Sequence, residues 1–184
     1  AARNAGLKEA QGEWFMYLDD DEWFDDPQEI IKFFITGEYQ KYNSASYIVR
    51  NYMDPNGNNY IDSYPSRMVK LNSSIHFVGR IHEFLTPFCE PRKEFNDFVH
   101  HYGYVYKNEQ EHVKHVWRNI EPLLVIRKEY PGDPRWIMQL DQEYFSAYDY
   151  EKVITTSIEG LEEWRKYKKH LTLSLIHISE PTRR

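Results

Sequence analysis

An aromatic-rich apolar run that leads directly into a run of acids constrains the fold of this chain more than any other feature. Residues 14–18 read Trp-Phe-Met-Tyr-Leu, and residues 19–22 read Asp-Asp-Asp-Glu. The apolar run predicts a buried strand over residues 13–18. In open α/β sheets, ligands bind beyond the carboxyl ends of the strands. Neighbouring carboxylates repel one another without a counter-charge, and Mg²⁺ or Mn²⁺ prefers oxygen ligands. The run therefore predicts a site for a metal ion and a diphosphate, with a solvated acidic turn that caps the next helix as the alternative.

The rest of the first hundred residues predicts short helices and strands. Residues 1–10 read as the end of a helix, and Asp25-Asp26-Pro27 is a helix start with an acidic cap and a proline in the first turn. The Asn56-Gly57 pair favours a tight hairpin. The strands expected around and after that hairpin span residues 46–53, 60–64 and 66–71.

The pattern becomes helical near Lys107. Apolar residues at helical spacing predict helices over 109–130, 135–147 and 151–167. A Pro-Gly-Asp-Pro break at 131–134 separates the first two. Paired helices with a Tyr-Asp-Tyr-Glu-Lys turn at 148–152 resemble tetratricopeptide repeats. Such repeats bury their faces against neighbours, so we expect further repeats to follow and a protein partner to bind them.

Several motifs occur along the chain in a fixed order. The segment Ala2-Arg3-Asn4-Ala5-Gly6 leads through Gly12 into the predicted strand, which ends in an Asp-x-Asp motif at Asp19 and Asp21. The segments Phe77-Val78-Gly79-Arg80-Ile81-His82-Glu83 and His100-His101-Tyr102-Gly103-Tyr104 follow. Together, over residues 1–106, these motifs resemble the family 2 glycosyltransferases. The resemblance implies an α/β fold of the GT-A type and a nucleotide-diphosphate sugar as donor.

The resemblance also implies the residues of a metal site. Asp21 would bind Mn²⁺ or Mg²⁺, and Asp19 would contact the ribose of the nucleotide. Asp20 occupies the variable middle position of the motif, and Glu22 replaces Asp21 if the register is shifted by one. His101 would reach the metal or the diphosphate. In an alternating strand His100 points to the opposite face, so only one of the two histidines can serve.

Further roles follow from the same resemblance. Glu83 would act as the general base that takes the acceptor proton, with inversion at the anomeric carbon. His82 would orient Glu83 or touch the phosphates, although many relatives carry a pair of acids there. Gly79 would let the backbone approach the donor sugar, and Arg3 would lie near the nucleotide. Arg67 and Arg80 are either phosphate partners or ordinary paired arginines.

Composition narrows the functional classes. The net charge of −6 argues against a nucleic-acid binder, which needs a basic face. The single cysteine, Cys89, agrees with a reducing compartment. No apolar run is long enough to span a bilayer. We expect the protein to be cytoplasmic, either free or at the inner membrane surface. The acceptor could be a glycan, a lipid-linked saccharide or a peptide.

The expected organisation has three parts. Residues 1–106 form a partial GT-A domain whose nucleotide-binding strands would precede Ala1, residues 107–170 form the helical region, and residues 171–184 form a tail that resembles translated adapter sequence and is not native. This chain alone would then have negligible turnover. Two other functions stay open: a nucleotidyltransferase, and a non-catalytic interaction module that carries repeats.

Overall fold

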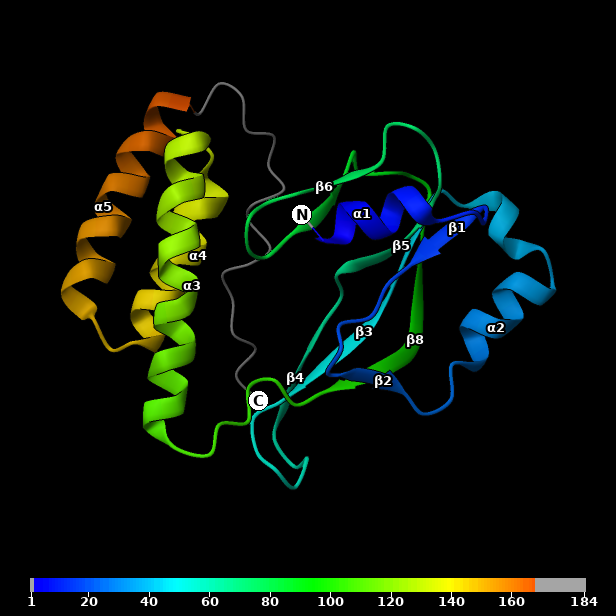
Figure 1. The fold of residues 1–184 in the computed structure, drawn as a ribbon, viewed down its shortest axis with the longest axis horizontal. Coiled ribbons are helices and arrows are strands. Elements are labelled where there is room, and N and C mark those ends of the chain that lie inside the picture. The colour runs from blue at the N-terminus through cyan, green and yellow to red at the C-terminus, as the bar shows by residue number, and fades with distance from the viewer. Residues whose placement is uncertain (1, 168–184) are drawn as a thin grey trace. The chain divides into compact units, whose positions relative to one another are not determined.

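A computed structural model describes residues 2–167, and the chain divides into two compact units, Ala1–His112 and Val113–Arg184 (Figure 1). Each unit has its own buried residues, and each is described by itself. The predicted tail at 171–184 lies outside the described residues. Within the described part of the chain, no helix combines the length and the apolar character that crossing a membrane requires.

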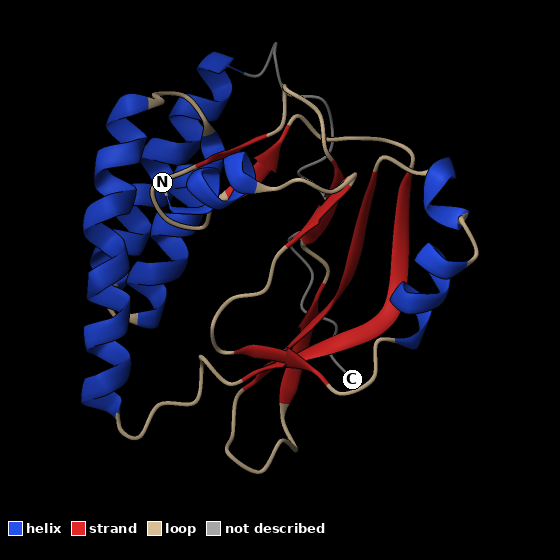
Figure 2. Ribbon diagram, turned by 45° about the vertical axis from the view of Figure 1, so that its right-hand side comes forward, coloured by secondary structure: helices blue, strands red, loops and turns tan. Residues whose placement is uncertain are grey.

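The first unit is built around a mixed sheet (Figure 2). Its main strands lie in the order β1, β5, β3, β8, β2, and β4 pairs with β3 beside that path. The pairing of β3 with β8 is parallel, and the other pairings of this sheet are antiparallel. The strands are β1 (Trp14–Met16), β2 (Glu22–Phe24), β3 (Ser44–Tyr52), β4 (Tyr60–Ser63), β5 (Ser66–Lys70) and β8 (Arg92–His101).

Strand β8 lies between β3 and β2, and its pairing decides which side chains meet. Asn51 of β3 and Glu22 of β2 both lie level with His101. Trp23 of β2 lies level with His100. Because successive strand residues point to opposite faces, the two neighbouring histidines face different surroundings.

Two apolar clusters cover the sheet. Helix α2 (Gln28–Ile35) packs Ile30 and Phe33 against strand residues such as Tyr47 and Val99. The N–H of Ile30 donates to the Asp97 carboxylate at 2.7 Å, so β8 satisfies the start of this helix. A 3₁₀ helix, η1 (Glu38–Lys41), follows α2.

The second cluster joins the sheet to a hairpin. Strands β6 (His76–Val78) and β7 (Phe84–Thr86) pair antiparallel, and helix α1 (Ala2–Glu9) lies against β6. Phe77 and Leu85 are buried in this cluster with Val69 of β5, and Leu7 of α1 packs against it.

Most of the predicted elements are confirmed within one or two residues, but β1 is shorter and less buried than predicted. It ends at Met16, and Met16 and Leu18 are 43% and 38% exposed. Strand β1 lies at the edge of the sheet, and Trp14 and Phe15 pack against different core clusters as partly buried side chains. The acid run also differs from a simple loop, because its last residue, Glu22, begins strand β2.

The second unit contains most of α3 (Glu109–Glu129), together with α4 (Pro134–Ser146) and α5 (Tyr150–Tyr167). Asp133 caps α4 by accepting the N–H of Arg135, and Pro134 occupies the first turn. Arg127 of α3 forms ion pairs with Glu159 and Glu163 of α5.

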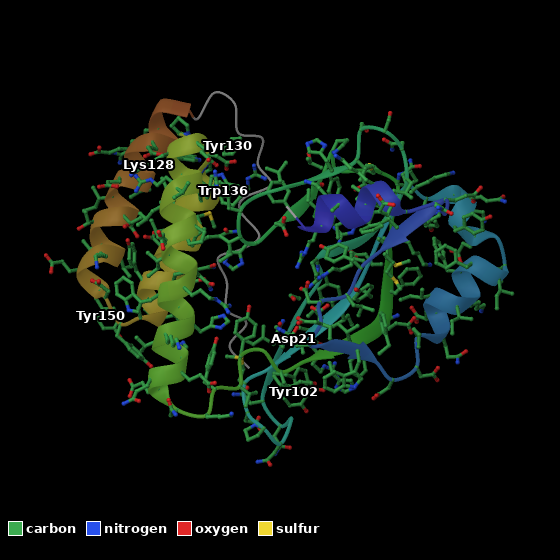
Figure 3. The ribbon with its side chains drawn as sticks, viewed as in Figure 1. Asp21, Tyr102, Lys128, Tyr130, Trp136 and Tyr150 are labelled. Carbon is green, nitrogen blue, oxygen red and sulfur yellow. The ribbon has the colours of Figure 1, made fainter. Side chains whose placement is uncertain are left out.

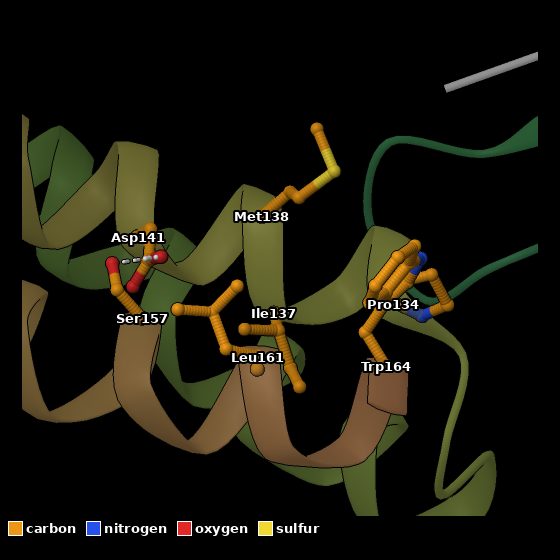
Figure 4. Close-up of a pocket in the computed structure, with 8 residues that line it drawn as sticks. Pro134, Ile137, Met138, Asp141, Ser157, Leu161 and Trp164 are labelled. Carbon is orange, nitrogen blue, oxygen red and sulfur yellow. Dashed lines mark hydrogen bonds between the residues drawn. The ribbon is translucent and has the colours of Figure 1, made fainter. Parts of the chain in front are cut away.

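An apolar groove of about 470 Å³ lies between α4 and α5, with Asp141 and Ser157 hydrogen-bonded at 2.7 Å in its wall (Figure 4). The likeness of these helices to tetratricopeptide repeats stays a prediction.

Candidate active site

Two arginines bind three carboxylates near the end of β1. Arg3 of α1 forms an ion pair with Asp19, and its Nε lies 3.4 Å from Glu83 Oε2. Arg67 of β5 contacts Asp19 Oδ2 at 3.1 Å and Glu22 Oε1 at 2.7 Å. The antiparallel pairing of β1 with β5 explains this meeting, because the N–H of Tyr17 donates to the carbonyl of Arg67 just where the acid run begins. Arg3 thereby contacts two other predicted site residues, Asp19 and Glu83.

Arg67 is a buried cation with a buried partner. The residue is 8% exposed, and the Glu22 side chain is 1% exposed. Burial by itself lowers the pKa of Arg67, but Tyr17, Glu22 and Asp19 together raise it above its ordinary value. Glu22 also accepts the backbone N–H of Asp19 at 3.0 Å. Glu22 is therefore committed to Arg67 and to the backbone, whereas Asp21 is exposed.

Asp21 and His101 form a second pair. Asp21 Oδ2 lies 3.3 Å from His101 Nε2, and the side chains are 51% and 17% exposed. The other ring nitrogen, Nδ1, lies 2.7 Å from Asn51 Oδ1. Figure 3 shows Asp21 and Tyr102, the residue after His101, at the same end of the sheet. Two residues from distant parts of the sequence that were predicted as metal ligands are thus neighbours.

Gly103 gives this pair its space. A Cβ atom at this position would overlap His101 Nε2 and lie 2.9 Å from Asp21 Oδ2. A side chain would therefore occupy the space beside these two atoms, which the sequence predicts as metal ligands. The glycine in the His-Tyr-Gly-Tyr segment is explained by this close approach.

The donor atoms of the pair fit a divalent cation. Carboxylate oxygens suit Mn²⁺ and Mg²⁺, and neutral imidazole is a common metal ligand. Two ligand atoms about 2.1 Å from such an ion and at right angles lie about 3 Å apart, close to the spacing here. Within the part of the chain that the structure describes, no group of three or more His, Cys, Asp or Glu side chains could hold a metal ion.

The loop before Glu83 is held against α1. Asn4 donates to the Phe77 carbonyl at 3.0 Å and accepts the Phe77 N–H at 2.8 Å. Gly79 has a φ of 115°, a conformation that favours glycine, and His82 also has a positive φ of 50°. The Glu83 side chain is 17% exposed. The Ala-Arg-Asn motif thus contacts both ends of this loop, through Arg3 at Glu83 and through Asn4 at Phe77.

An aromatic stack occupies the opposite face at the same end of the sheet. His100 stacks on Trp23 and Tyr52, and Tyr102 stacks on the same two residues. His100 is hydrogen-bonded to the hydroxyl of Tyr52 at 2.7 Å and to Asp25 at 2.8 Å. His100 and His101 therefore have separate partners, as expected for consecutive strand residues.

Sequence reasoning missed several residues that shape the site. It did not decide whether Arg67 contacts phosphate or is an ordinary paired arginine. The structure shows that Arg67 forms a buried ion pair with Glu22. Asn4 and Gly103 belong to two of the sequence motifs described above, and those motifs were the signal that could have identified them. Asn51 gave no signal, because its role depends on the parallel pairing of β3 with β8.

Comparison with known proteins is consistent with this geometry. The profile of the family described as glycosyl transferase family 2 matches residues 1–97, more than half of the chain. A search of curated proteins found no significant match. The family match spans both arginines and the three carboxylates that they contact. This chain therefore belongs to glycosyl transferase family 2.

Proposed function

We propose that this protein is a metal-assisted, inverting glycosyltransferase that moves a sugar from a nucleotide-diphosphate donor to a hydroxyl acceptor. The observation that carries the proposal is the contact of one guanidinium, that of Arg3, with both Asp19 and Glu83. The residue proposed to contact the nucleotide and the residue proposed as base are thereby neighbours. Glycosyl transfer needs both, because the donor must be held in line with an acceptor that loses its proton.

Asp21 and His101 are proposed to hold Mn²⁺ or Mg²⁺ together with the donor diphosphate. The cation would neutralise the charge that develops on the leaving diphosphate. Asp19, whose two oxygens already accept from Arg3 and Arg67, retains lone pairs for a ribose hydroxyl. The two arginines hold this carboxylate in a fixed orientation.

Glu83 is proposed to take the proton of the acceptor hydroxyl. The acceptor oxygen forms its bond to the anomeric carbon as the bond to the diphosphate oxygen breaks on the opposite side, which inverts the configuration. Arg3 fixes the direction of the Glu83 carboxylate, and Gly79 lets the backbone of the preceding loop approach the sugar. The acceptor is proposed to be a glycan, a lipid-linked saccharide or a peptide.

A donor-hydrolysis screen tests the proposal. The full-length product of the gene is incubated with a panel of nucleotide sugars and either Mn²⁺ or EDTA, and released nucleoside diphosphate is measured. We expect Asp21→Asn to lose metal-dependent binding and turnover. We expect Glu83→Gln to bind nucleoside diphosphate with Mn²⁺ normally but to lose about 10²- to 10⁴-fold in turnover.

Asp20→Asn is the matched control, because Asp20 is an adjacent, exposed carboxylate outside both pairs. Its turnover should equal that of the unmodified protein. Absence of both turnover and calorimetric binding of nucleoside diphosphate with Mn²⁺ would reject the proposal. Release of pyrophosphate in place of nucleoside diphosphate would indicate nucleotidyl transfer.

A further inference from the structure

We propose that Asn51 is a positioning residue that fixes the tautomer of His101 and so prepares the Asp21–His101 pair for a divalent cation. The proposal rests on the metal site of the proposed function. It concerns a residue on β3 that lies in none of the family motifs found in the sequence. Its argument begins with the orientation of the Asn51 side-chain amide.

The surroundings of Asn51 settle which end of its amide faces His101. The Nδ2 group lies 3.1 Å from the Val49 carbonyl and 3.0 Å from the Ile61 carbonyl. Ser63 Oγ is 3.1 Å away. A flipped amide would direct its oxygen at two carbonyl oxygens, which only accept hydrogen bonds. The pairing of β3 with β4 therefore directs Oδ1 of Asn51 toward the histidine.

This orientation places a hydrogen on Nδ1 of the imidazole ring. Asn51 Oδ1 accepts only, so the 2.7 Å contact requires a hydrogen on His101 Nδ1. In the neutral ring the other nitrogen, Nε2, then carries a lone pair and no hydrogen. That lone pair lies 3.3 Å from Asp21 Oδ2. In this neutral tautomer two acceptor atoms face each other, an arrangement that a shared cation stabilises.

The surroundings of His101 restrict rotation of its imidazole ring. His101 is mostly buried, and Tyr104 packs against it edge-on with ring centroids 5.3 Å apart. Metal-bound histidines generally donate their second N–H to a fixed acceptor, and loss of that acceptor costs about 10- to 100-fold in metal affinity. Asn51 supplies such an acceptor without adding a negative charge.

The first experiment measures the tautomer in the metal-free protein. Long-range ¹H–¹⁵N correlation spectra of ¹⁵N-labelled protein at alkaline pH distinguish Nδ1–H from Nε2–H histidines. We expect His101 as Nδ1–H in the unmodified chain. We expect Asn51→Ala to shift it toward Nε2–H, and Asn51→Asp to retain Nδ1–H because a carboxylate also accepts. Asn43→Ala is the control, since Asn43 is exposed and donates to the Glu90 carbonyl elsewhere.

The second experiment measures the affinity for Mn²⁺ in the presence of a nucleoside diphosphate, by electron paramagnetic resonance of the free ion. Asn51→Ala should weaken binding about 10- to 100-fold, and Asn43→Ala should leave it unchanged. An Nε2–H ring in the unmodified protein would overturn the proposal, as would an Asn51→Ala protein that keeps both the tautomer and the affinity. If Asn51→Ala does not fold, the unmodified protein and Asn51→Asp still decide the tautomer.

The two proposals can fail separately. The tautomer is read without metal, donor or acceptor, so an inactive protein with an Nδ1–H His101 that depends on Asn51 would reject the proposed function alone. An active enzyme whose His101 does not respond to Asn51 would reject this inference alone.

Discussion

At the scale of single residues, the buried ion pair of Arg67 with Glu22 makes the strongest prediction about stability. Arg67→Met leaves the Glu22 carboxylate, 1% exposed, without its cation. Removing one partner of a buried pair typically costs about 3–5 kcal/mol, because the remaining charge stays desolvated. We expect a loss of this size in the free energy of unfolding, measured with urea.

The added change Glu22→Gln should recover part of that loss, because it removes the uncompensated charge. Arg135→Met is the matched control: Arg135 pairs with Asp133, its side chain is 47% exposed, and the cost should stay within about 1 kcal/mol. Equal losses in the two single variants would show that burial of the pair does not matter.

Gly103 allows a prediction that separates binding from folding. In Gly103→Ala, the new methyl group takes the space between His101 Nε2 and Asp21 Oδ2. We expect Mn²⁺ affinity to fall at least tenfold, because both proposed ligand atoms are displaced, with a smaller effect on unfolding. In the control Gly12→Ala, the nearest atom is the Trp14 carbonyl oxygen at an ordinary 3.4 Å. Unchanged affinity in Gly103→Ala would contradict the assignment of the pair.

At the scale of elements, two helical glycines should respond to alanine in opposite directions. A Cβ on Gly160 of α5 would lie 2.6 Å from Ile137 Cγ2 of α4, and that methyl belongs to a stiff β-branched side chain. Overpacking of about 1–3 kcal/mol should exceed the gain of about 1 kcal/mol in helix propensity. Gly6 of α1 has no atom within 4 Å of such a Cβ.

Thermal unfolding followed by circular dichroism checks this comparison. Gly160→Ala should lower the midpoint, and Gly6→Ala should keep or raise it. A raised midpoint in both variants would mean that α5 moves away from Ile137 at no cost.

The same elements show what could be predicted from sequence. The three long helices follow from apolar spacing and from the Pro-Gly-Asp-Pro break, both of which are local signals. Strands β2, β6 and β7 have three residues each, too few for a periodic pattern, and were missed. The contacts of Arg3 with Glu83 and of Asn51 with His101 depend on pairings between distant segments, which no local pattern contains.

At the scale of the whole molecule, two separate sets of buried residues predict two units of unfolding. Tyr47, Met68 and Val99 are fully buried in the first unit, and Leu123 and Trp136 are at most 1% exposed in the second. Segments with separate cores commonly open as separate cooperative units. We expect Arg67→Met to lower protection of β3 and β8, and Gly160→Ala to lower protection of α4 and α5.

Native-state hydrogen exchange at low urea concentrations measures both sets of amides in one experiment. Each variant should change the opening free energy of its own unit and leave that of the other within error. A change in both units from either variant would show that they unfold together.

The irregular pairing of β8 with β3 has a consequence for changes in chain length. Between Ser46 and Ile48, β3 advances by two residues while β8 advances from Glu94 to Phe98, by four. The number of extra residues in β8 at this bulge is even, so its side chains alternate between the two faces in the same way on both sides of the bulge. His101 therefore remains level with Asn51. A single inserted residue at this bulge would exchange the surroundings of His100 and His101, whereas an inserted pair would preserve them. Whether an insertion at this bulge has an odd or an even number of residues should therefore matter more for the strand than how long the insertion is.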